Sequence, residues 1–191
     1  IERRKLYLKA AQKAATMISA ARTETHGYLK EKGFPEATAF VLDGVRMKSE
    51  GGEKVVVDNV LLIPMRDVNT NDVLGVQQIF LFDNEWQKKM IYGMRAKGAV
   101  FRIGNKAARE TYLVEGYATG LSVDAALRMS RLNASVLVCF SSGNIVHVAQ
   151  LVGGKRYIFA DNDKSGTGEK AAKDAGLPFC MADEFGDAND L

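Results

Sequence analysis

The first part of the chain shows helix and strand patterns separated by polar turns. Apolar residues recur near helical spacing across residues 3–22, which predicts an amphipathic helix. Apolar runs at 60–65 and 74–81 flank a turn rich in Asn and Asp, and a third segment follows at 88–92. This arrangement predicts an antiparallel β-meander. Shorter elements are expected between the helix and the meander, namely a helix ending at Lys32–Gly33, a strand within 41–47 and another at 55–57.

From residue 109 the pattern changes to apolar runs that alternate with helical segments. Strands are expected at 112–114, 136–140, 157–160 and 178–181, with helices near 119–131, ending near 151 and near 168–175. Strands that alternate with helices form right-handed βαβ units and a parallel sheet. The expected fold class is therefore α/β, with a parallel sheet flanked by helices and preceded by a small α+β subdomain with an antiparallel meander. The expected domains are residues 1–108 and residues 109–191.

Carboxylates follow two of the expected parallel strands. Glu115 follows the first of them, and Asp161 and Asp163 follow the third. Ligand sites in such sheets lie at the carboxyl ends of the strands, and side chains two residues apart on an extended chain point the same way. Three carboxylates gathered at one edge repel one another unless a cation lies among them. Hard oxygen ligands of this kind favour Mg²⁺ or Mn²⁺.

Each of these carboxylates also has an ordinary structural interpretation. The helix dipole favours a residue such as Glu115 at the amino end of the next helix. An Asp-x-Asp pair also occurs in Asx turns and helix caps. Asp187 and Asp190, near the end of the chain, are candidates for outer metal ligands or for solvated acids.

The composition is that of a globular protein and argues against a membrane-spanning, disulfide-rich or zinc-binding chain. The 191 residues are 47% hydrophobic, which is ordinary for a globular core, and no run approaches the ~20 apolar residues of a membrane span. Two cysteines and two histidines do not make a disulfide scaffold or a zinc site. No signal peptide is expected, because the amino end is charged and leads into the expected amphipathic helix. The chain starts without Met and stops abruptly, so we expect it to be a piece of a longer protein.

The positive charge is concentrated in one part of the chain. The net charge is +3, basic residues outnumber acidic ones before residue 109, and no acid lies between Glu85 and Glu110. A basic surface beside an acidic metal site suits a polyanionic substrate, although it is also compatible with a solvated face that has no partner. The candidate phosphate contacts are Arg66, Lys88, Lys89, Arg95, Lys97, Arg102, Lys106 and Lys164. Arg66 and Lys97 are favoured because each follows a strand or flanks a glycine turn. Trp86 and Tyr92 are candidates for base stacking or for the core.

The strand-end carboxylates resemble the Toprim domain of primases, topoisomerases and certain nucleases. That family has a Glu after one strand and an Asp-x-Asp after a later one. The matching residues are Glu115, Asp161 and Asp163, with Gly116 and Gly166 where the family has glycines. The resemblance implies that Glu115, Asp161 and Asp163 are catalytic. With Asp187 they would bind Mg²⁺ or Mn²⁺, and Glu115 would be a metal ligand or the base for a 3′-hydroxyl.

The resemblance extends over nearly the whole chain to the primases of plasmids and phages. The segments that carry it are His26–Leu29, Lys32–Gly33, Pro64–Asp67, Leu74–Gln78, Lys89, Gly93 and Asp187–Leu191. It implies a nucleotidyltransferase, the RNA-polymerase core of a primase, which makes short RNA primers on a DNA template. The implied partners are single-stranded DNA, ribonucleoside triphosphates and a replicative helicase or a helicase domain of the same polypeptide. No membrane partner is expected, and the implied location is the cytoplasm of a bacterial or phage-infected cell.

Two other functions stay open on the sequence. A Toprim nuclease would use the same carboxylates and metals to direct water at a phosphodiester. A non-catalytic Toprim module would bind nucleic acid without turnover, but the intact carboxylate triad argues against it. A topoisomerase is disfavoured because no domain with a strand-cleaving tyrosine is visible.

Overall fold

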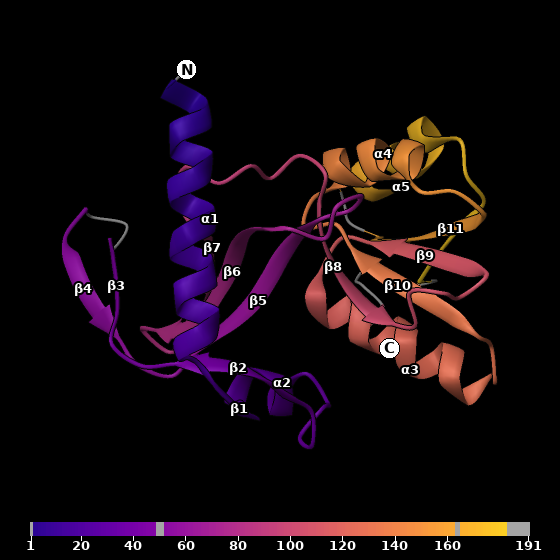
Figure 1. The fold of residues 1–191 in the computed structure, drawn as a ribbon. Coiled ribbons are helices and arrows are strands. Elements are labelled where there is room, and N and C mark those ends of the chain that lie inside the picture. The colour runs from indigo at the N-terminus through magenta and orange to yellow at the C-terminus, as the bar shows by residue number, and fades with distance from the viewer. Residues whose placement is uncertain (1, 49–51, 163–164, 183–191) are drawn as a thin grey trace. The chain divides into compact units, whose positions relative to one another are not determined.

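Figure 1 shows the computed structural model, which describes residues 2–48, 52–162 and 165–182. The chain divides into two compact units. The first contains Ile1–Met65 and Asp72–Arg95, and the second contains Arg66–Asn71 and Ala96–Leu191. Each unit has a hydrophobic core of its own. No described helix is long and apolar enough to cross a membrane.

The first unit combines a long helix, an antiparallel sheet and a separate hairpin. Its elements are α1 (Glu2–Ala20), β1 (Arg22–Thr25), α2 (Gly27–Glu31), β2 (Thr38–Leu42), β3 (Val45–Lys48), β4 (Lys54–Val57), β5 (Val60–Asp67), β6 (Val73–Phe82) and β7 (Glu85–Met90). The sheet order is β1-β2-β5-β6-β7, and β3 pairs only with β4 among the described strands. The expected meander is confirmed by β5, β6 and β7, with β6 and β7 antiparallel.

The helix α1 closes the core of the first unit. Ala10, Ala14 and Met17 are its buried residues, and their spacing of three or four residues places them on one face. They pack with Val60, Leu62, Val76, Phe80, Val45 and Ile91. The sequence predicted this helix but not its buried face, because its large apolar residues Leu6 and Leu8 are exposed. The pattern at 41–47 was interpreted as one strand, but Asp43 and Gly44 turn the chain between β2 and β3, and Gly44 has a φ of 65°.

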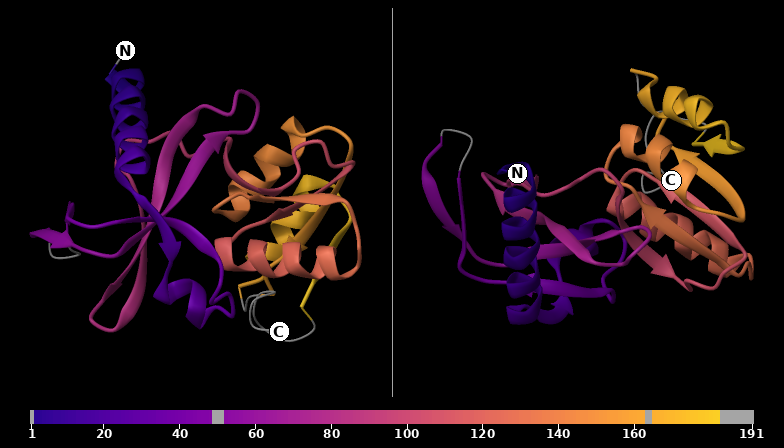
Figure 2. Two further views of the ribbon diagram at one scale, coloured as in Figure 1. Left: turned by 60° about the horizontal axis from the view of Figure 1, so that its bottom comes forward. Right: turned by 45° about the horizontal axis from the view of Figure 1, so that its top comes forward.

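The second unit is a mostly parallel sheet between two layers of helices. Its elements are β8 (Ala99–Gly104), β9 (Glu110–Val114), α3 (Tyr117–Met129), β10 (Ala134–Val138), α4 (Ser142–Leu151), β11 (Lys155–Ala160), α5 (Thr167–Ala175) and β12 (Phe179–Met181). The strand order is β8-β10-β9-β11-β12. Strands β9 to β12 are parallel, and β8 is antiparallel to β10. Figures 1 and 2 show α3 on one face of this sheet and α4 with α5 on the other. The expected α/β fold is confirmed.

Two strands were missed by the sequence pattern. β1 has no apolar alternation, because it is an edge strand whose side chains are mostly exposed. β8 lies inside the basic, glycine-punctuated run, but it pairs with β10 and belongs to the second unit. The compact units therefore divide the chain before residue 108, while the functional division into residues 1–108 and 109–191 stays a prediction.

Candidate active site

Glu115 lies directly after β9, at a strand end held by backbone hydrogen bonds. The Cys139 N–H donates to the Val114 carbonyl at 2.8 Å, and the Phe140 N–H donates to the Glu115 carbonyl at 2.9 Å. The Glu115 side chain is half-buried. The backbone of Glu115 is therefore held by the pairing of β9 with β10.

Glycines allow α3 to begin immediately after Glu115. Gly116 is the N-cap residue of α3, and a Cβ on it would lie 3.1 Å from Thr119 Oγ1. A Cβ on Gly120 would come within 2.7 Å of Val138 Cγ2. A side chain at Gly120 would push the first turn of α3 away from β10, whereas one at Gly116 would crowd Thr119 of the same helix. The lack of a side chain at Gly120 therefore lets the amino end of α3 pack against β10.

Asp161 lies directly after β11, against the first turn of α5. A Cβ on Gly168 would be only 2.2 Å from the Asp161 carbonyl oxygen, so this close approach requires glycine. The Asn162 side-chain amide donates to the Ala182 carbonyl at 2.9 Å. The backbone around Asp161 is thus held by α5 on one side and by the residue after β12 on the other.

The parallel pairing brings Glu115 and Asp161 to the same edge of the sheet. Tyr157 is the register partner of Tyr112, and Ile158 of Leu113, so β9 and β11 end side by side. Both carboxylates are half-buried. Asp163, Lys164, Asp187 and Asp190 lie outside the described residues. In residues 2–48, 52–162 and 165–182, no group of three or more His, Cys, Asp and Glu residues could hold a metal ion.

The donor set at this edge fits a hard divalent cation. Glu115 and Asp161 offer carboxylate oxygens, which Mg²⁺ and Mn²⁺ prefer. A soft metal is not favoured, because the cysteine nearby is inert. Burial and the Glu115 charge raise the pKa of the Cys139 thiol, so this thiol stays protonated at neutral pH.

Two of the predicted basic residues lie at the same edge as the carboxylates. β8 runs antiparallel to β10, so its amino end is beside the carboxyl end of β10. Lys97 precedes this end of β8 and is exposed. Arg66 pairs with Val100 at the end of β5, and its guanidinium donates to the Asn71 carbonyl at 3.1 Å. All of these residues belong to the second unit.

The other predicted basic residues are not gathered at this edge. The Arg102 guanidinium donates to Ser135 Oγ at 2.9 Å, near the amino end of β10, and burial lowers its pKa. Lys88 and Lys89 lie on β7 in the first unit. Lys88 Nζ is 5.5 Å from the centre of the Tyr28 ring, and Lys89 Nζ donates to the Lys48 carbonyl at 3.3 Å. Arg95 ends the first unit, and Lys106 is exposed in the turn after β8.

Asn144 has a role that the sequence pattern did not reveal. Its side chain does not cap a helix, because the Asn144 N–H donates to Ser141 Oγ, and Ser141 is the N-cap residue of α4. The Asn144 side-chain amide donates to the carbonyls of Ala99 and Cys139, and its oxygen accepts from the Gly98 N–H, each at 2.8 Å. This buried side chain joins the segment after Lys97 to the end of β10.

Comparison with known proteins agrees with this geometry. Residues 110–183 match the family model of the Toprim domain, and this segment begins with β9 and includes both carboxylates. This part of the second unit is therefore similar to a Toprim domain, and Toprim domains generally bind divalent metal ions.

A search of solved structures finds the crystal structure of the primase fragment of the bacteriophage T7 primase-helicase protein. The TM-score is 0.47 and the sequence identity 16%, and the match covers 84% of this chain and 62% of that chain. The chain thus spans less than two thirds of the fragment that it matches.

Proposed function

We propose that the chain is the RNA-polymerase core of a DNA primase, which makes short RNA primers on single-stranded DNA with the help of Mg²⁺ or Mn²⁺. The observation that carries the proposal is the shared edge of the sheet in the second unit. It combines carboxylates suited to a divalent ion with the cations Arg66 and Lys97, which suit a triphosphate. The primase-like segments of the sequence support it further.

The roles of the residues follow from their chemistry. Glu115, Asp161 and Asp163, with Asp187, would hold one or two divalent ions, which would stabilise the charge on the entering and leaving oxygens. Glu115 is also suited to accept the proton of the 3′-hydroxyl as its oxygen attacks the α-phosphorus of a nucleotide. The bond from this phosphorus to the bridging oxygen breaks, and pyrophosphate leaves. Arg66 and Lys97, with Lys164, would bind the triphosphate, so catalysis consists mainly of positioning and charge neutralisation.

A primer-synthesis assay tests the proposal. The chain is incubated with single-stranded DNA, ribonucleoside triphosphates and Mg²⁺ or Mn²⁺, and radiolabelled products are separated on a gel. We expect products of at least two nucleotides that require both the metal and the template. Cleavage of the DNA without synthesis would favour the nuclease instead. Binding of DNA without either reaction would favour the non-catalytic module.

A helicase partner belongs to the same proposal. Primers are useful only where template becomes single-stranded, so a replicative helicase or a helicase domain of the same polypeptide is the expected neighbour. Addition of a replicative helicase to the assay should raise the yield of primers. An unchanged yield would argue that the chain works without one.

A further inference from the structure

A groove in the first unit is lined by the β3–β4 hairpin together with other elements of that unit. Its volume is about 860 Å³. The hairpin forms one wall, and β6, β7, the turn after β7 and α1 form the others. The residues used below are Lys13, Arg46, Lys48, Lys54, Lys89 and Tyr92. We call this space the hairpin groove.

Strand alternation explains why the hairpin carries charge beside the groove. Val45 and Met47 on β3 pair with Val57 and Val55 on β4, and Val45, Met47 and Val57 pack against the core. Side chains at the intervening positions point the other way. Arg46, Lys48 and Lys54 occupy three of those positions and are exposed.

Among the described residues that line the groove, the charged ones are all basic. They are Lys13, Arg46, Lys48, Lys54 and Lys89, and no described Asp or Glu lines it. Within the described part of the chain, none of these five cations forms an ion pair with a carboxylate. Cations that repel one another and are not neutralised by the fold are suited to an anionic partner. A row of such cations along a groove suits a polymer of phosphates better than a single anion.

An exposed aromatic side chain in the groove favours a single-stranded nucleic acid over a duplex as the ligand. Tyr92 lines the groove and is 88% exposed, so its ring is accessible for stacking. Trp86, the other aromatic candidate from the sequence, is half-buried, and its indole N–H donates to Glu31 at 2.7 Å while its ring contacts Tyr28. Unpaired bases can stack on an exposed ring, whereas bases within a duplex cannot.

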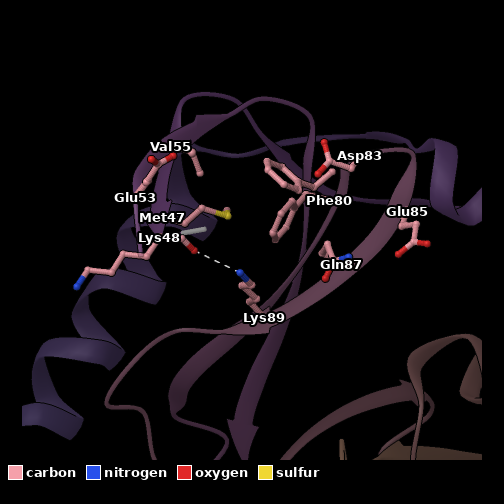
Figure 3. Close-up of a pocket in the computed structure, with 10 residues that line it drawn as sticks. Met47, Lys48, Glu53, Val55, Phe80, Asp83, Glu85, Gln87 and Lys89 are labelled. Carbon is pink, nitrogen blue, oxygen red and sulfur yellow. Dashed lines mark hydrogen bonds between the residues drawn. The ribbon is translucent and has the colours of Figure 1, made fainter. Parts of the chain in front are cut away.

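The neighbouring pocket has a different character. Figure 3 shows this second pocket, of about 450 Å³, between the hairpin and β7. It shares Lys48 and Lys89 with the hairpin groove, and the dashed line in the figure marks the bond between Lys89 Nζ and the Lys48 carbonyl. Glu53, Asp83 and Glu85 also line this pocket. Because these acids repel phosphates, the hairpin groove is better suited to a polyanion than this pocket is.

We propose that the hairpin groove binds a single-stranded nucleic acid, with phosphates on the five cations and a base stacked on Tyr92. The inference rests on the proposed function and deepens it, because it assigns the template to a surface of the first unit that is made of residues other than the metal-binding carboxylates. Four of the cations, Lys13, Arg46, Lys48 and Lys54, are absent from the basic run that the sequence alone brought to attention.

The test measures binding without metal or nucleotides, so that it does not depend on catalysis. A fluorescein-labelled oligodeoxythymidylate of about 16 nucleotides is titrated with the full chain, and anisotropy is followed at several salt concentrations. The first variant combines Arg46→Gln, Lys48→Gln and Lys54→Gln. The matched control combines Lys30→Gln, Lys155→Gln and Lys173→Gln, which removes the same charge from exposed positions outside the groove.

Each phosphate contact contributes about 0.7 to the slope of log affinity against log salt. The groove variant should therefore lose about two units of slope and bind roughly ten- to a hundredfold more weakly at 0.1 M salt. The control should keep most of the slope and affinity. If both variants lost the same slope and affinity, the loss would be explained by the change in net charge alone, and the proposal would be overturned.

Tyr92 gives an independent arm of the test. Tyr92→Ala should weaken binding roughly tenfold, whereas Tyr92→Phe keeps the ring and should bind like the original chain. Duplex DNA of the same sequence and poly-glutamate should compete poorly with the oligonucleotide. Equal competition by either polymer, or no effect of Tyr92→Ala, would overturn the proposal. If the groove variants lose binding while the original chain makes no primers, the groove stands and the proposed primase activity fails.

Discussion

At the scale of single residues, the two described carboxylates are positioned by their backbones. Glu115 is fixed by strand-to-strand hydrogen bonds at the end of β9, and Asp161 by the close approach of Gly168. Backbones held in this way keep the two residues at the edge of the sheet, from which their carboxylates can bind a metal. The sequence signal for them was the carboxylate after an apolar run, which marks a strand end directly.

The first prediction concerns the Asp161 carboxylate. Asp161→Asn should abolish primer synthesis and weaken Mn²⁺ binding in calorimetric titration, because an amide keeps the shape but removes the charge that attracts the cation. The thermal unfolding midpoint should change little. Asp174→Asn, at an exposed position of α5, is the control and should leave both properties intact. Normal metal binding and synthesis in Asp161→Asn would remove this residue from the site.

The second prediction uses the pKa shifts of the two cysteines. Burial raises the pKa of the Cys180 thiol, and burial together with the Glu115 charge raises that of Cys139. Only the thiolate is alkylated, so a raised pKa slows the reaction at neutral pH and moves its rise to higher pH. Iodoacetamide should therefore modify Cys180 more slowly than a free thiol at pH 8, and Cys139 only after unfolding. Mass spectrometry of digested protein measures this, and rapid labelling of Cys139 in the folded chain would contradict the burial.

At the scale of elements, the patterns that burial creates were the ones that could be predicted. The parallel strands β9, β10 and β11 show as apolar runs. The helix α1 was predicted too, but its buried stripe is Ala10, Ala14 and Met17, whereas its large apolar residues Leu6 and Leu8 are exposed. The edge strand β1 and the strand β8 were missed, because most β1 side chains are exposed and β8 carries Arg102 and ends at Gly104.

Contacts between distant segments could not be predicted from local pattern. Asn144 bonds to Gly98 and Ala99, residues far from it in sequence, and nothing near Asn144 indicates these partners. The shared edge that brings Arg66 and Lys97 near the strand-end carboxylates depends on the order β5-β8-β10. The sequence favoured these two cations as phosphate contacts only because each follows a strand or flanks a glycine turn.

The third prediction concerns the junction of β11 and α5. Gly168→Ala would place a methyl group 2.2 Å from the Asp161 carbonyl oxygen, so either α5 or the strand end must move. We expect a loss of about 1–3 kcal/mol in the free energy of unfolding, together with weaker Mn²⁺ binding because Asp161 shifts. Chemical denaturation and calorimetry measure the two effects.

Gly143→Ala provides the matched control for this substitution. Gly143 lies in α4, and a Cβ there meets nothing within 4 Å. Alanine is favoured over glycine in helices by about 0.5–1 kcal/mol, so this variant should be equally or more stable. If Gly168→Ala is as harmless as Gly143→Ala, the close approach of α5 to Asp161 does not exist in solution.

At the scale of the whole molecule, the division into compact units decides which fragments can fold. The longer segment of the second unit starts at Ala96 and therefore includes β8. The sequence pattern had placed the boundary between the two domains after residue 108, which leaves β8 in the first domain. β8 covers the edge of β10, where Ser135 to Val138 pair with Phe101 to Gly104. A fragment that starts at residue 109 lacks this strand and leaves the ladder groups of β10 unpaired.

The fourth prediction compares two fragments with the full chain. The fragment 96–191 should unfold at a higher temperature than the fragment 109–191, because only the longer one keeps β8 against β10 and the bond between Arg102 and Ser135. Circular dichroism melting curves measure this difference. Neither fragment should make primers, since both lack residues 1–95 and with them the hairpin groove and Arg66. The full chain should form at least dinucleotides in the same assay. Primer synthesis by the fragment 96–191 would mean that the first unit is dispensable for holding the template, and equal melting temperatures would mean that β8 adds no stability to the sheet.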